Sequence, residues 1–376
     1  MATLVADLEM TAPLADLQLP AEVSGLLALV RRRGRPVGRV RLRGSGRVPA
    51  ARIEQAIGLQ VRPPAEDAPP PRASPISIVV CTRDRPQELA RCLEALRVHA
   101  AAGHDVVVVD NAPSDDQTAA LLKSFPYRYV HEPAAGLDRA RNRGIAEARR
   151  EIVAFTDDDC IPDKTWVDAL VAPYRDPEVA ATTGLVMPIE LETEAQERFE
   201  AYCANRRIFE PRLYRAPATP PSAAGVAGLG ANMSFRRARL LELGGFDPRF
   251  DGGTVTLSGG DTEAFARVLA AGGAIAYRPD ALVWHRHRRE LESVQRVVFG
   301  YGVGVFAFLA KRLVEDGDLG VLVTAPRWLL GPPLKAAWNA VCGRPSTPAD
   351  LVRMELLGAL QGPLRYRRVR RAAAAR

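Results

Sequence analysis

The sequence predicts an α/β protein whose central sheet is mostly parallel and carries helices on both faces. From residue 75 onward, apolar runs of strand length alternate with segments of helical periodicity. Strands that alternate with helices form parallel sheets through right-handed crossovers. Polar clusters follow the apolar runs, at the sheet edge where open α/β sheets bind ligands. At 376 residues and 47% hydrophobic content, the chain is long enough for this domain and smaller appendages.

The first 60 residues are predicted to form a small separate module. Residues 26–43, "LLALVRRRGRPVGRVRLR", hold two short alternating apolar runs around "RGRP", which is typical of a β-hairpin. Residues 61–75 then contain six prolines and almost no periodicity. We therefore expect a stiff, extended linker over residues 61–74.

Residues 75–290 are predicted to form the main domain, which begins with the buried strand "ISIVVCT". The next segment, "PQELARCLEALRVH", is helical, because Leu89, Leu93 and Leu96 share one face and Pro86 suits a first helical turn. Further strands are expected at 106–110, 127–132 and 151–157, with helices at 115–125 and 137–150. The second half is less regular, with a helix at 193–210, a long loop at 211–228 and a strand running into a helix at 230–246.

Residues 291–376 are predicted to form a helical extension with a basic tail. The apolar run Val297 to Ala310 has 14 residues, fewer than the roughly 20 that a membrane-spanning helix needs. Covering the main core is favoured for this run over lying in a membrane interface.

The net charge of +7 is concentrated in two arginine-rich segments, residues 31–52 and 365–376. These segments are suited to phosphates or to an anionic membrane surface, and simple solubility is the alternative. Aromatic residues make up 6% of the chain and do not interleave with the basic runs. We therefore expect no nucleic-acid partner, and peripheral membrane contact stays open.

Cysteine usage and the N-terminus predict a cytoplasmic location, extending to the inner face of the cytoplasmic membrane. The five cysteines form no CxxC pair and their number is odd, which is typical of reduced thiols and not of a disulfide framework or a structural zinc site. The first 17 residues carry acids where a signal peptide has a basic segment.

Four polar clusters fall at the ends of the predicted strands. They are Thr82 to Asp84, Asp110 with Asn111, His131 with Glu132, and Asp157 to Asp159. Like charges about 5 Å apart repel by roughly 3 kcal/mol at an effective dielectric near 20, so three consecutive carboxylates need solvent or a cation. Because all four clusters fall at one sheet edge, a binding site is favoured over a solvated rim.

Seven motifs occur in a particular order between residues 75 and 290. They are "VVCTRDRP", "VVVVDNAPSDD", "GLDRARNRGI", "FTDDDCIP", "GANMSFRR", "GGDTEAFARVL" and "VWHRHR". In this order the chain resembles the family 2 glycosyltransferases, which are inverting, nucleotide-sugar-dependent enzymes with the GT-A fold. The resemblance thus implies a Rossmann-like sheet and a sugar-transfer reaction.

The resemblance implies a division of roles among the three carboxylates. Asp157 would face the ribose, Asp159 would bind Mn²⁺ or Mg²⁺, and Asp158 would be a weaker nucleotide-sugar contact between them. Carboxylate oxygens suit both metals. Family members often carry a further Asp where this chain has Cys160.

By the same resemblance, several residues would contact the nucleotide-sugar: Thr82, Arg83, Asp84, Asp110, Asn111, Arg141 and Asn142. A helix cap is the alternative for Asp84, and a turn residue is the alternative for Asp110. His285 and His287 would complete the metal site, with a buried structural histidine as the alternative. Arg286 and Arg288 are equally suited to the diphosphate.

The resemblance places the general base at Asp261, with Glu263 assisting or orienting it. A helix N-terminal acid is the alternative for Glu263. The family usually has an acid before the base, and this chain has Gly260 there. The acceptor side would be formed by Gly230, Ala231 and Asn232, where small residues permit close approach.

The predicted function is transfer of a sugar from a UDP-, dTDP- or GDP-linked donor to an acceptor hydroxyl with inversion. The acceptor would be a glycan, a lipid-linked molecule or a small molecule, in the synthesis of a bacterial surface polysaccharide, a glycolipid or a glycosylated metabolite. Two alternatives stay open: another nucleotide-dependent transferase on a doubly wound sheet, and a non-catalytic scaffold with this fold. The first is disfavoured, because "CTRDRP" has no Gly-rich loop.

Overall fold

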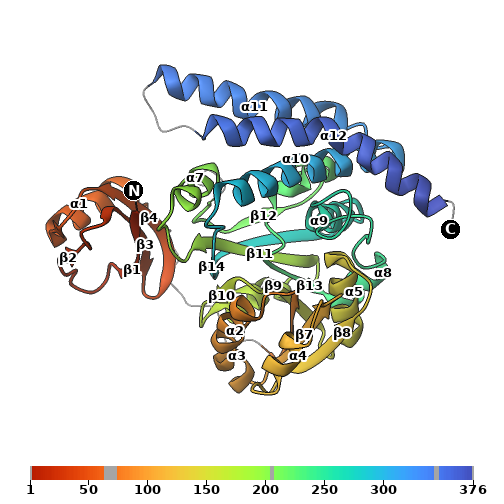
Figure 1. The fold of residues 1–376 in the computed structure, drawn as a ribbon, viewed down its shortest axis with the longest axis horizontal. Helices are drawn as coiled ribbons and strands as arrows, with labels where there is room; N and C mark the ends of the chain where they lie inside the picture. Colours follow the sequence, from red (N-terminus) through yellow and green to blue (C-terminus); the bar gives the residue numbers. More distant parts are fainter. Residues whose placement is uncertain (1, 63–73, 204–206, 343–346, 375–376) are drawn as a thin grey trace.

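The computed structural model describes residues 2–62, 74–203, 207–342 and 347–374. A nine-stranded mixed sheet forms the centre of the molecule and carries helices on both faces, which confirms the predicted α/β class (Figure 1). A small β-rich module lies at one end of this sheet, and three long helices lie over the sheet. The predicted linker falls mostly outside the described residues.

The first half of the main domain is a parallel four-stranded unit in which the strand order is β8-β7-β6-β9. Each pair of consecutive strands is joined by a helical crossover, as periodicity predicts. The elements are β6 (Ser77–Thr82), α2 (Pro86–Ala95), α3 (Arg97–Ala101), β7 (Asp105–Asn111), α4 (Gln117–Leu122), β8 (Arg128–Glu132), α5 (Leu137–Glu147) and β9 (Ile152–Asp157). Because β7 lies on one side of β6 and β9 on the other, the strand order reverses at the β6–β9 junction.

The second half extends this sheet with strands of both directions, several of which lie in stretches without a clear sequence signal. The elements are β10 (Cys160–Pro162), α6 (Trp166–Val171), the 3₁₀ turn η1 (Ala172–Arg175), β11 (Val179–Pro188), α7 (Glu194–Cys203), β12 (Arg212–Tyr214), the 3₁₀ turn η3 (Pro221–Val226), β13 (Asn232–Arg236), α8 (Arg237–Glu242), α9 (Gly260–Ala270) and β14 (Ala274–His285). β13 runs antiparallel between β9 and β11, and β14 runs parallel to β11. The long β14 delivers His285 to the same region of the sheet as β9, because β10 pairs Cys160 with His285.

Both faces of the sheet are buried, which explains the uninterrupted apolar runs of the central strands. Alternate residues of one strand face opposite sides, so Val79 packs with α5 and α9 while Val80 packs with α2 and α6. Trp166 is fully buried among the residues of the second face.

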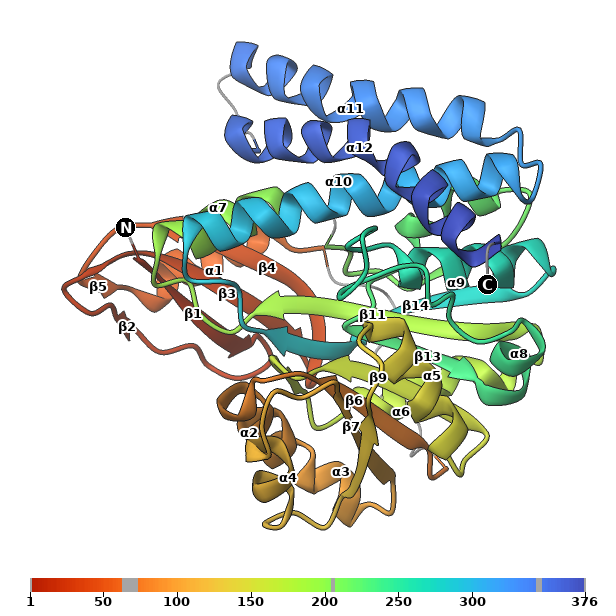
Figure 2. The same ribbon diagram turned by 45° about the vertical axis from the view of Figure 1, so that its right-hand side comes forward.

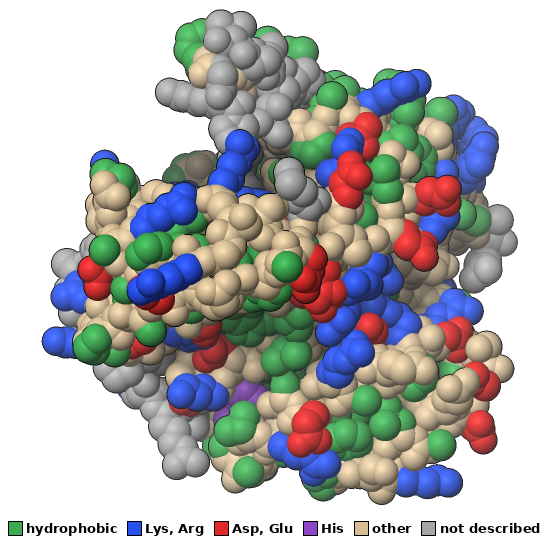
Figure 3. Space-filling model, turned by 60° about the vertical axis from the view of Figure 1, so that its left-hand side comes forward, with side chains coloured by type: hydrophobic (Ala, Val, Ile, Leu, Met, Phe, Trp, Pro, Cys, Tyr) green, Lys and Arg blue, Asp and Glu red, His purple; other side chains and the backbone are tan. Residues whose placement is uncertain are grey.

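The N-terminal module has its own small core and is docked by charged contacts. Its elements are β1 (Ala2–Glu9), β2 (Leu17–Gln18), β3 (Val23–Arg32), β4 (Arg35–Arg43), β5 (Arg47–Val48) and α1 (Ala50–Gln60). β3 and β4 form an antiparallel hairpin, and β1 joins β3 in parallel. Arg31 reaches Asp163 at 2.6 Å and Arg39 reaches Glu200 at 3.1 Å in the main domain. Figure 3 turns the module's side forward and shows a hollowed face on which basic and acidic side chains gather together.

The C-terminal helices are α10 (Leu291–Val314), α11 (Val321–Val341) and α12 (Ala349–Ala374). In both ribbon views α10 lies on the sheet side, and α11 and α12 form the outermost layer above it (Figure 2). α10 is long and apolar enough to cross a membrane, but 56% of its most apolar window is buried inside the protein. A helix buried on both sides is typical of a core element, in agreement with the predicted role of this run.

Candidate active site

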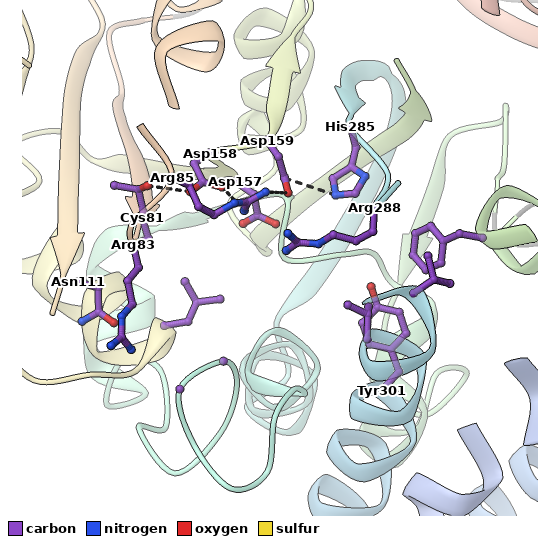
Figure 4. A pocket seen from close by; sticks show the side chains of 17 residues that line it. Cys81, Arg83, Arg85, Asn111, Asp157, Asp158, Asp159, His285, Arg288 and Tyr301 are labelled. Carbon is purple, nitrogen blue, oxygen red and sulfur yellow. Dashed lines mark hydrogen bonds and ion pairs between the residues drawn. The ribbon is translucent and has the colours of Figure 1, made fainter. Parts of the chain in front are cut away.

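A cavity of about 320 Å³ opens at the carboxyl ends of β6 and β9, where the strand order reverses. Cys81 of β6 pairs directly with Asp157 of β9, so both strand ends deliver polar side chains to one place. Open α/β sheets bind ligands at such a junction because two neighbouring loops diverge there. The predicted residues that line this cavity are Thr82, Arg83, Asn111, Asp157, Asp158, Asp159 and His285 (Figure 4).

Two of the three consecutive carboxylates are held by hydrogen bonds. Asp158 accepts from the Thr82 hydroxyl at 2.7 Å and from Arg85 Nη1 at 2.5 Å. Asp159 accepts from Arg85 Nη2 at 2.7 Å. Arg85 therefore clamps both carboxylates with its two terminal nitrogens, a geometry that guanidinium groups favour.

The remaining carboxylate, Asp157, has a different environment. Burial, and after it the negative charge of Asp159, raises the pKa of Asp157 to about 7. Burial opposes ionisation of Asp159 too, but neighbouring positive charge, from His285 whenever its ring is protonated and from Arg85, lowers the pKa of Asp159 below the ordinary value. The residues that the structure describes donate no hydrogen bond to the Asp157 carboxylate, so its oxygens are available to a ligand.

A chain of buried groups leads away from Asp159 through two histidines. His285 Nε2 lies 3.4 Å from Asp159 Oδ1, and His285 Nδ1 lies 2.9 Å from His287 Nδ1. His287 Nε2 lies 3.3 Å from Glu200 Oε2. Burial raises the pKa of Glu200, but the Arg207 charge and the His287 hydrogen bond outweigh it and lower the pKa to about 2. Glu200 is therefore an ionised acceptor.

The ionised Glu200 sets the tautomers of both rings. His287 must donate its Nε2 proton to Glu200, which leaves His287 Nδ1 as an acceptor. His285 then donates from Nδ1, so its Nε2 carries a lone pair. Burial lowers the pKa of His285, which favours this neutral form. Two acceptors, His285 Nε2 and Asp159 Oδ1, consequently face each other at 3.4 Å.

This facing pair of acceptors fits a divalent cation. Imidazole nitrogen and carboxylate oxygen are both ligands of Mn²⁺, and Mg²⁺ and Mn²⁺ sites of this kind are usually completed by water and substrate phosphates. Within the described residues, no cluster of three or more His, Cys, Asp and Glu side chains forms a complete protein ligand set. The protein would thus supply two ligands, and His287 would orient one of them without touching the cation.

Two residues predicted to contact the nucleotide lie beside the cavity and do not line it. The Asp84 carboxylate accepts from the backbone N–H and the hydroxyl of Ser114 at 2.8 and 2.9 Å, and so anchors a loop. Asp110 is buried and accepts from the Tyr129 hydroxyl at 3.0 Å. Its other oxygen, Oδ1, has no hydrogen-bond partner among the described residues, which leaves an acceptor available beside Asn111.

A second group of carboxylates surrounds Arg141 on α5. Arg141 Nη1 donates to Asp138 at 2.9 Å and to Asp251 at 2.7 Å. Asp261, in the first turn of α9, accepts from the backbone N–H groups of Gly230 at 2.7 Å and Thr262 at 2.6 Å. Burial, and then the Asp251 charge, raises the pKa of Asp261. A raised pKa suits a carboxylate that has to take up a proton.

Two glycines allow this group to assemble. A Cβ at Gly260 would lie 1.9 Å from Asp138 Oδ2, so the Asp138 carboxylate occupies the space of the missing acid. A Cβ at Gly230 would lie 2.7 Å from Arg141 Nη2 and 3.3 Å from Asp261 Oδ2. Asp138 Oδ2 is buried without a hydrogen-bond partner among the described residues. Asp138 is thus a site candidate that sequence analysis missed, and the unexpected Gly260 is its only sequence signal.

Four other predicted residues are bound into the scaffold. Glu263 is buried and pairs with Arg267 at 2.6 Å and with Lys311, so its carboxylate is committed to a structural ion cluster. Asn142 exchanges two hydrogen bonds with the backbone of Phe246 at 2.8 and 2.7 Å. Asn232 binds the Trp166 indole and two backbone carbonyls, and its neighbour Ala231 packs against the core. These contacts favour positioning roles for all of them.

Arg85, Arg288 and Tyr301 also line the cavity. Figure 4 shows Arg288 extending toward the carboxylates from the His285 side, and Tyr301 rising from α10 below them. Arg85 follows the strand-end motif directly in "CTRDRP", which is a signal that sequence analysis passed over. Tyr301 lies in the apolar run of α10, and nothing in its sequence neighbourhood indicates a cavity position.

Comparisons with known proteins point to glycosyltransferases. The family model described as glycosyl transferase family 2 matches residues 77–239. The pre-mycofactocin glycosyltransferase of Mycobacterium tuberculosis is 30% identical over 284 residues, which cover 73% of this chain and 55% of the relative. The chain therefore spans about half the length of that relative. The succinoglycan biosynthesis protein ExoM of Rhizobium meliloti is 28% identical over 278 residues, covering 70% of this chain and 79% of the relative.

A solved structure shows the same fold. The mannosyltransferase PcManGT from Pyrobaculum calidifontis, in complex with GDP-Man and Mn²⁺, superimposes with a TM-score of 0.54 at 17% identity. The match covers 79% of this chain and 89% of that structure, which confirms the predicted GT-A fold. Over residues 77–239 the chain matches glycosyl transferase family 2, and this match together with the named relatives supports the family that the order of motifs predicts.

Proposed function

We propose that this protein is a divalent-metal-dependent, inverting glycosyltransferase that moves a sugar from a nucleoside diphosphate donor to an acceptor hydroxyl. The observation that carries the proposal is the acceptor pair of Asp159 and His285, 3.4 Å apart at the edge of the 320 Å³ cavity. Arg85 and Arg288 line the same cavity and supply positive charge for a diphosphate.

The donor would bind across the β6–β9 junction. Arg83 and Asn111 lie on the β6 and β7 side and would contact the nucleoside, with Asp110 Oδ1 as a further acceptor. Asp157 would accept hydrogen bonds from the ribose hydroxyls, since its carboxylate is not committed within the described part of the chain. Asp158 holds Thr82 and Arg85 in place, and we assign it a positioning role.

Asp159 and His285 would hold Mn²⁺ or Mg²⁺. Such a cation, when bound, neutralises the charge that develops on a departing nucleoside diphosphate. Arg85 shares this task from the protein side, because its guanidinium already spans Asp158 and Asp159.

Asp261 would act as the general base toward the acceptor hydroxyl. Burial, and then the Asp251 charge, raises the pKa of Asp261 above its ordinary value, which makes the carboxylate a better proton acceptor. Two backbone N–H groups fix its orientation, and Arg141 links it electrostatically to Asp157 on the donor side. Attack from the side of Asp261, opposite the leaving diphosphate, inverts the anomeric carbon.

The relatives suggest two acceptor classes. The relative from Mycobacterium tuberculosis is named a pre-mycofactocin glycosyltransferase, and the relative from Rhizobium meliloti is named a succinoglycan biosynthesis protein. We therefore infer a glycosylated metabolite or a polysaccharide intermediate as the acceptor, with the reaction at the cytoplasmic side of the cell.

A thermal-shift screen tests the proposal. UDP, dTDP, GDP and CMP are each added to the full chain with and without Mn²⁺, and S-adenosylmethionine is included for the competing transferase class. We expect one nucleoside diphosphate to raise the melting temperature only in the presence of Mn²⁺. The matching sugar donors are then incubated with the protein, and nucleotide release is measured. A lack of metal-dependent stabilisation by every nucleotide would refute the proposal, and binding without any release would favour a non-catalytic scaffold.

A further inference from the structure

α11 exposes apolar side chains toward both of its ends. They are Leu322 and Val323 in the first turn and Leu330, Leu334 and Trp338 in the second half, with Leu319 just before the helix, and their exposed fractions lie between 53% and 69%. At 3.6 residues per turn these positions fall on one half of the helix surface, on which Arg327 is also exposed. On its inner side α11 is attached to the protein, because Trp328 packs edge-on against Phe306 of α10 at 5.2 Å between ring centroids.

The outer surface of α12 has the same character at its centre and is basic at both ends. Leu357, Leu360 and Leu364 are exposed at helical spacing, and Leu360 is 72% exposed. Arg353 precedes this stripe and the exposed Arg367, Arg368 and Arg371 continue it, at intervals of three to four residues. One face of α12 is therefore apolar in the middle and cationic at its ends.

α12 cannot rotate to hide this face, because its other face is tightly packed against α10. A Cβ at Gly302 of α10 would lie 1.9 Å from the Glu355 carbonyl oxygen, and a Cβ at Gly358 of α12 would lie 2.1 Å from the Phe299 carbonyl oxygen. Glycines thus let the two backbones approach closely. Leu351, Ala359 and Tyr366 are buried on this packed face.

The charge of this layer is almost entirely positive. Residues 321–376 contain ten Lys and Arg but two Asp and Glu, whereas the whole chain carries a net charge of +7. Both acids are engaged inward: Glu355 is buried and accepts from the Tyr202 hydroxyl at 2.5 Å, and Asp350 pairs with Arg198. The outer layer therefore presents apolar and cationic groups together.

We propose that the outer face of α11 and α12 docks in the plane of an anionic lipid bilayer. Helices that combine an exposed apolar stripe with flanking Lys and Arg bind at the headgroup boundary, and Trp338 has the amphipathic ring that this region favours. Neither helix spans the membrane: α11 carries Arg327 and Lys335 within its length, and α12 carries arginines at both ends. Anionic lipid is chosen over a protein partner because positive charge borders the apolar stripe of α12 at both ends.

This surface also has a defined position relative to the cavity. α10 lies directly beneath α12, and its Val294, Val297 and Tyr301 line the cavity. A bilayer on the outer layer would thus lie one helix layer away from the cavity wall. The docking proposal itself rests on the surface alone and does not depend on the proposed reaction.

Vesicle flotation of the full chain tests the proposal. Phosphatidylcholine vesicles are compared with vesicles that contain about 30% phosphatidylglycerol. The anionic lipid gives the second set a negative surface potential, which attracts Lys and Arg side chains. We expect binding to the anionic vesicles, and weaker binding when salt is raised, because screening reduces the attraction. The combined variant Leu322→Ser, Leu330→Ser and Trp338→Ser should lose most of the binding. The variant Arg367→Ala and Arg368→Ala should weaken it by roughly tenfold to thirtyfold.

Matched controls change the same residue types elsewhere on the surface. Leu213→Ser with Leu241→Ser, and Arg43→Ala with Arg149→Ala, remove exposed side chains outside the outer layer and should leave vesicle binding unchanged. Circular dichroism checks that every variant is folded. Absence of wild-type binding to anionic vesicles would overturn the proposal. So would vesicle binding that survives both outer-layer variants, or a concentration-dependent dimer that the leucine and tryptophan changes abolish without any vesicle binding.

Discussion

Replacing His287 with leucine tests the tautomer argument at the proposed metal site. His287 is buried at 2% exposure and lies between His285, 2.9 Å away, and Glu200, 3.3 Å away. Leucine fills similar space but removes the acceptor for His285 Nδ1 and the donor to Glu200. His285 Nε2 is then free to carry the proton, which abolishes its lone pair toward Asp159.

The expected loss has two parts. Removing the group that orients a metal-binding histidine lowers metal affinity by roughly 10- to 100-fold, or about 1.4 to 2.7 kcal/mol. Loss of two buried hydrogen bonds lowers the free energy of unfolding by roughly 1 to 3 kcal/mol. His287→Gln should recover most of the affinity, because its amide oxygen can accept from His285 while its amide nitrogen donates to Glu200.

Mn²⁺ affinity is measured by the electron paramagnetic resonance signal of free Mn²⁺, with the stabilising nucleoside diphosphate present in excess. His99→Leu is the matched control, because His99 is also buried but contacts Trp166 and the Asp163 carbonyl instead. It should lower stability without changing the Mn²⁺ dissociation constant. A folded His287→Leu protein with wild-type Mn²⁺ affinity would refute the reasoning.

Four further predictions concern the carboxylates, a glycine and a histidine. Asp261→Asn should lower sugar transfer by at least about 100-fold, because it removes the general base, while nucleotide affinity measured by calorimetry stays within threefold (roughly 0.65 kcal/mol); a parallel loss of binding would contradict the role. Asp159→Ala should weaken Mn²⁺-dependent nucleotide binding by at least tenfold (about 1.4 kcal/mol) and leave metal-free binding little changed, and calorimetry with and without Mn²⁺ distinguishes the two. Gly260→Ala should lower both the melting temperature and transfer, since the new Cβ would lie 1.9 Å from Asp138 Oδ2, whereas Gly58→Ala, which meets no atom within 4 Å, should leave both unchanged; equal effects would argue against the close contact. Burial lowers the pKa of His99 to about 4, below its ordinary 6.5, so the unfolded state binds the extra proton and stability should fall by about 3 kcal/mol as pH drops from 6.5 to 4. Urea unfolding at several pH values measures this slope, which His99→Phe should reduce if the reasoning holds.

The parallel half of the fold was predictable because each of its elements has a local signal. The strands from Ile78 to Asp157 are continuous apolar runs, and the helices between them show one apolar face. β11 and β14 gave no comparable signal. β11 includes Gly184, where a Cβ atom would lie 2.0 Å from the Ala281 carbonyl oxygen, so a larger residue does not fit. β14 contains Pro279 within its length. Burial between neighbouring strands stabilises them despite these residues.

Sequence by itself determined where the charged groups end each strand. The three carboxylates after β9 and the Thr82 segment after β6 follow from periodicity, and parallel strands necessarily bring their carboxyl ends together. The family motifs then predicted which of these groups face a donor, and the assignments of Asp157, Asp159 and Asp261 stay predictions until binding and transfer are measured.

Only the tertiary structure decided how each carboxylate is used. Arg85 forms ion pairs with Asp158 and Asp159. Glu200 contacts His287, which in turn contacts His285 beside Asp159. The Asp138 carboxylate fills the space beside Gly260. Apart from the contact between the two histidines, each of these contacts, the Arg85 pair included, joins segments that are far apart in the sequence, and the direction of each side chain depends on what packs around it. Residue spacing along one strand carries no information about such neighbours. The sequence therefore indicates where the site lies, and the tertiary structure determines which side chains contact each carboxylate.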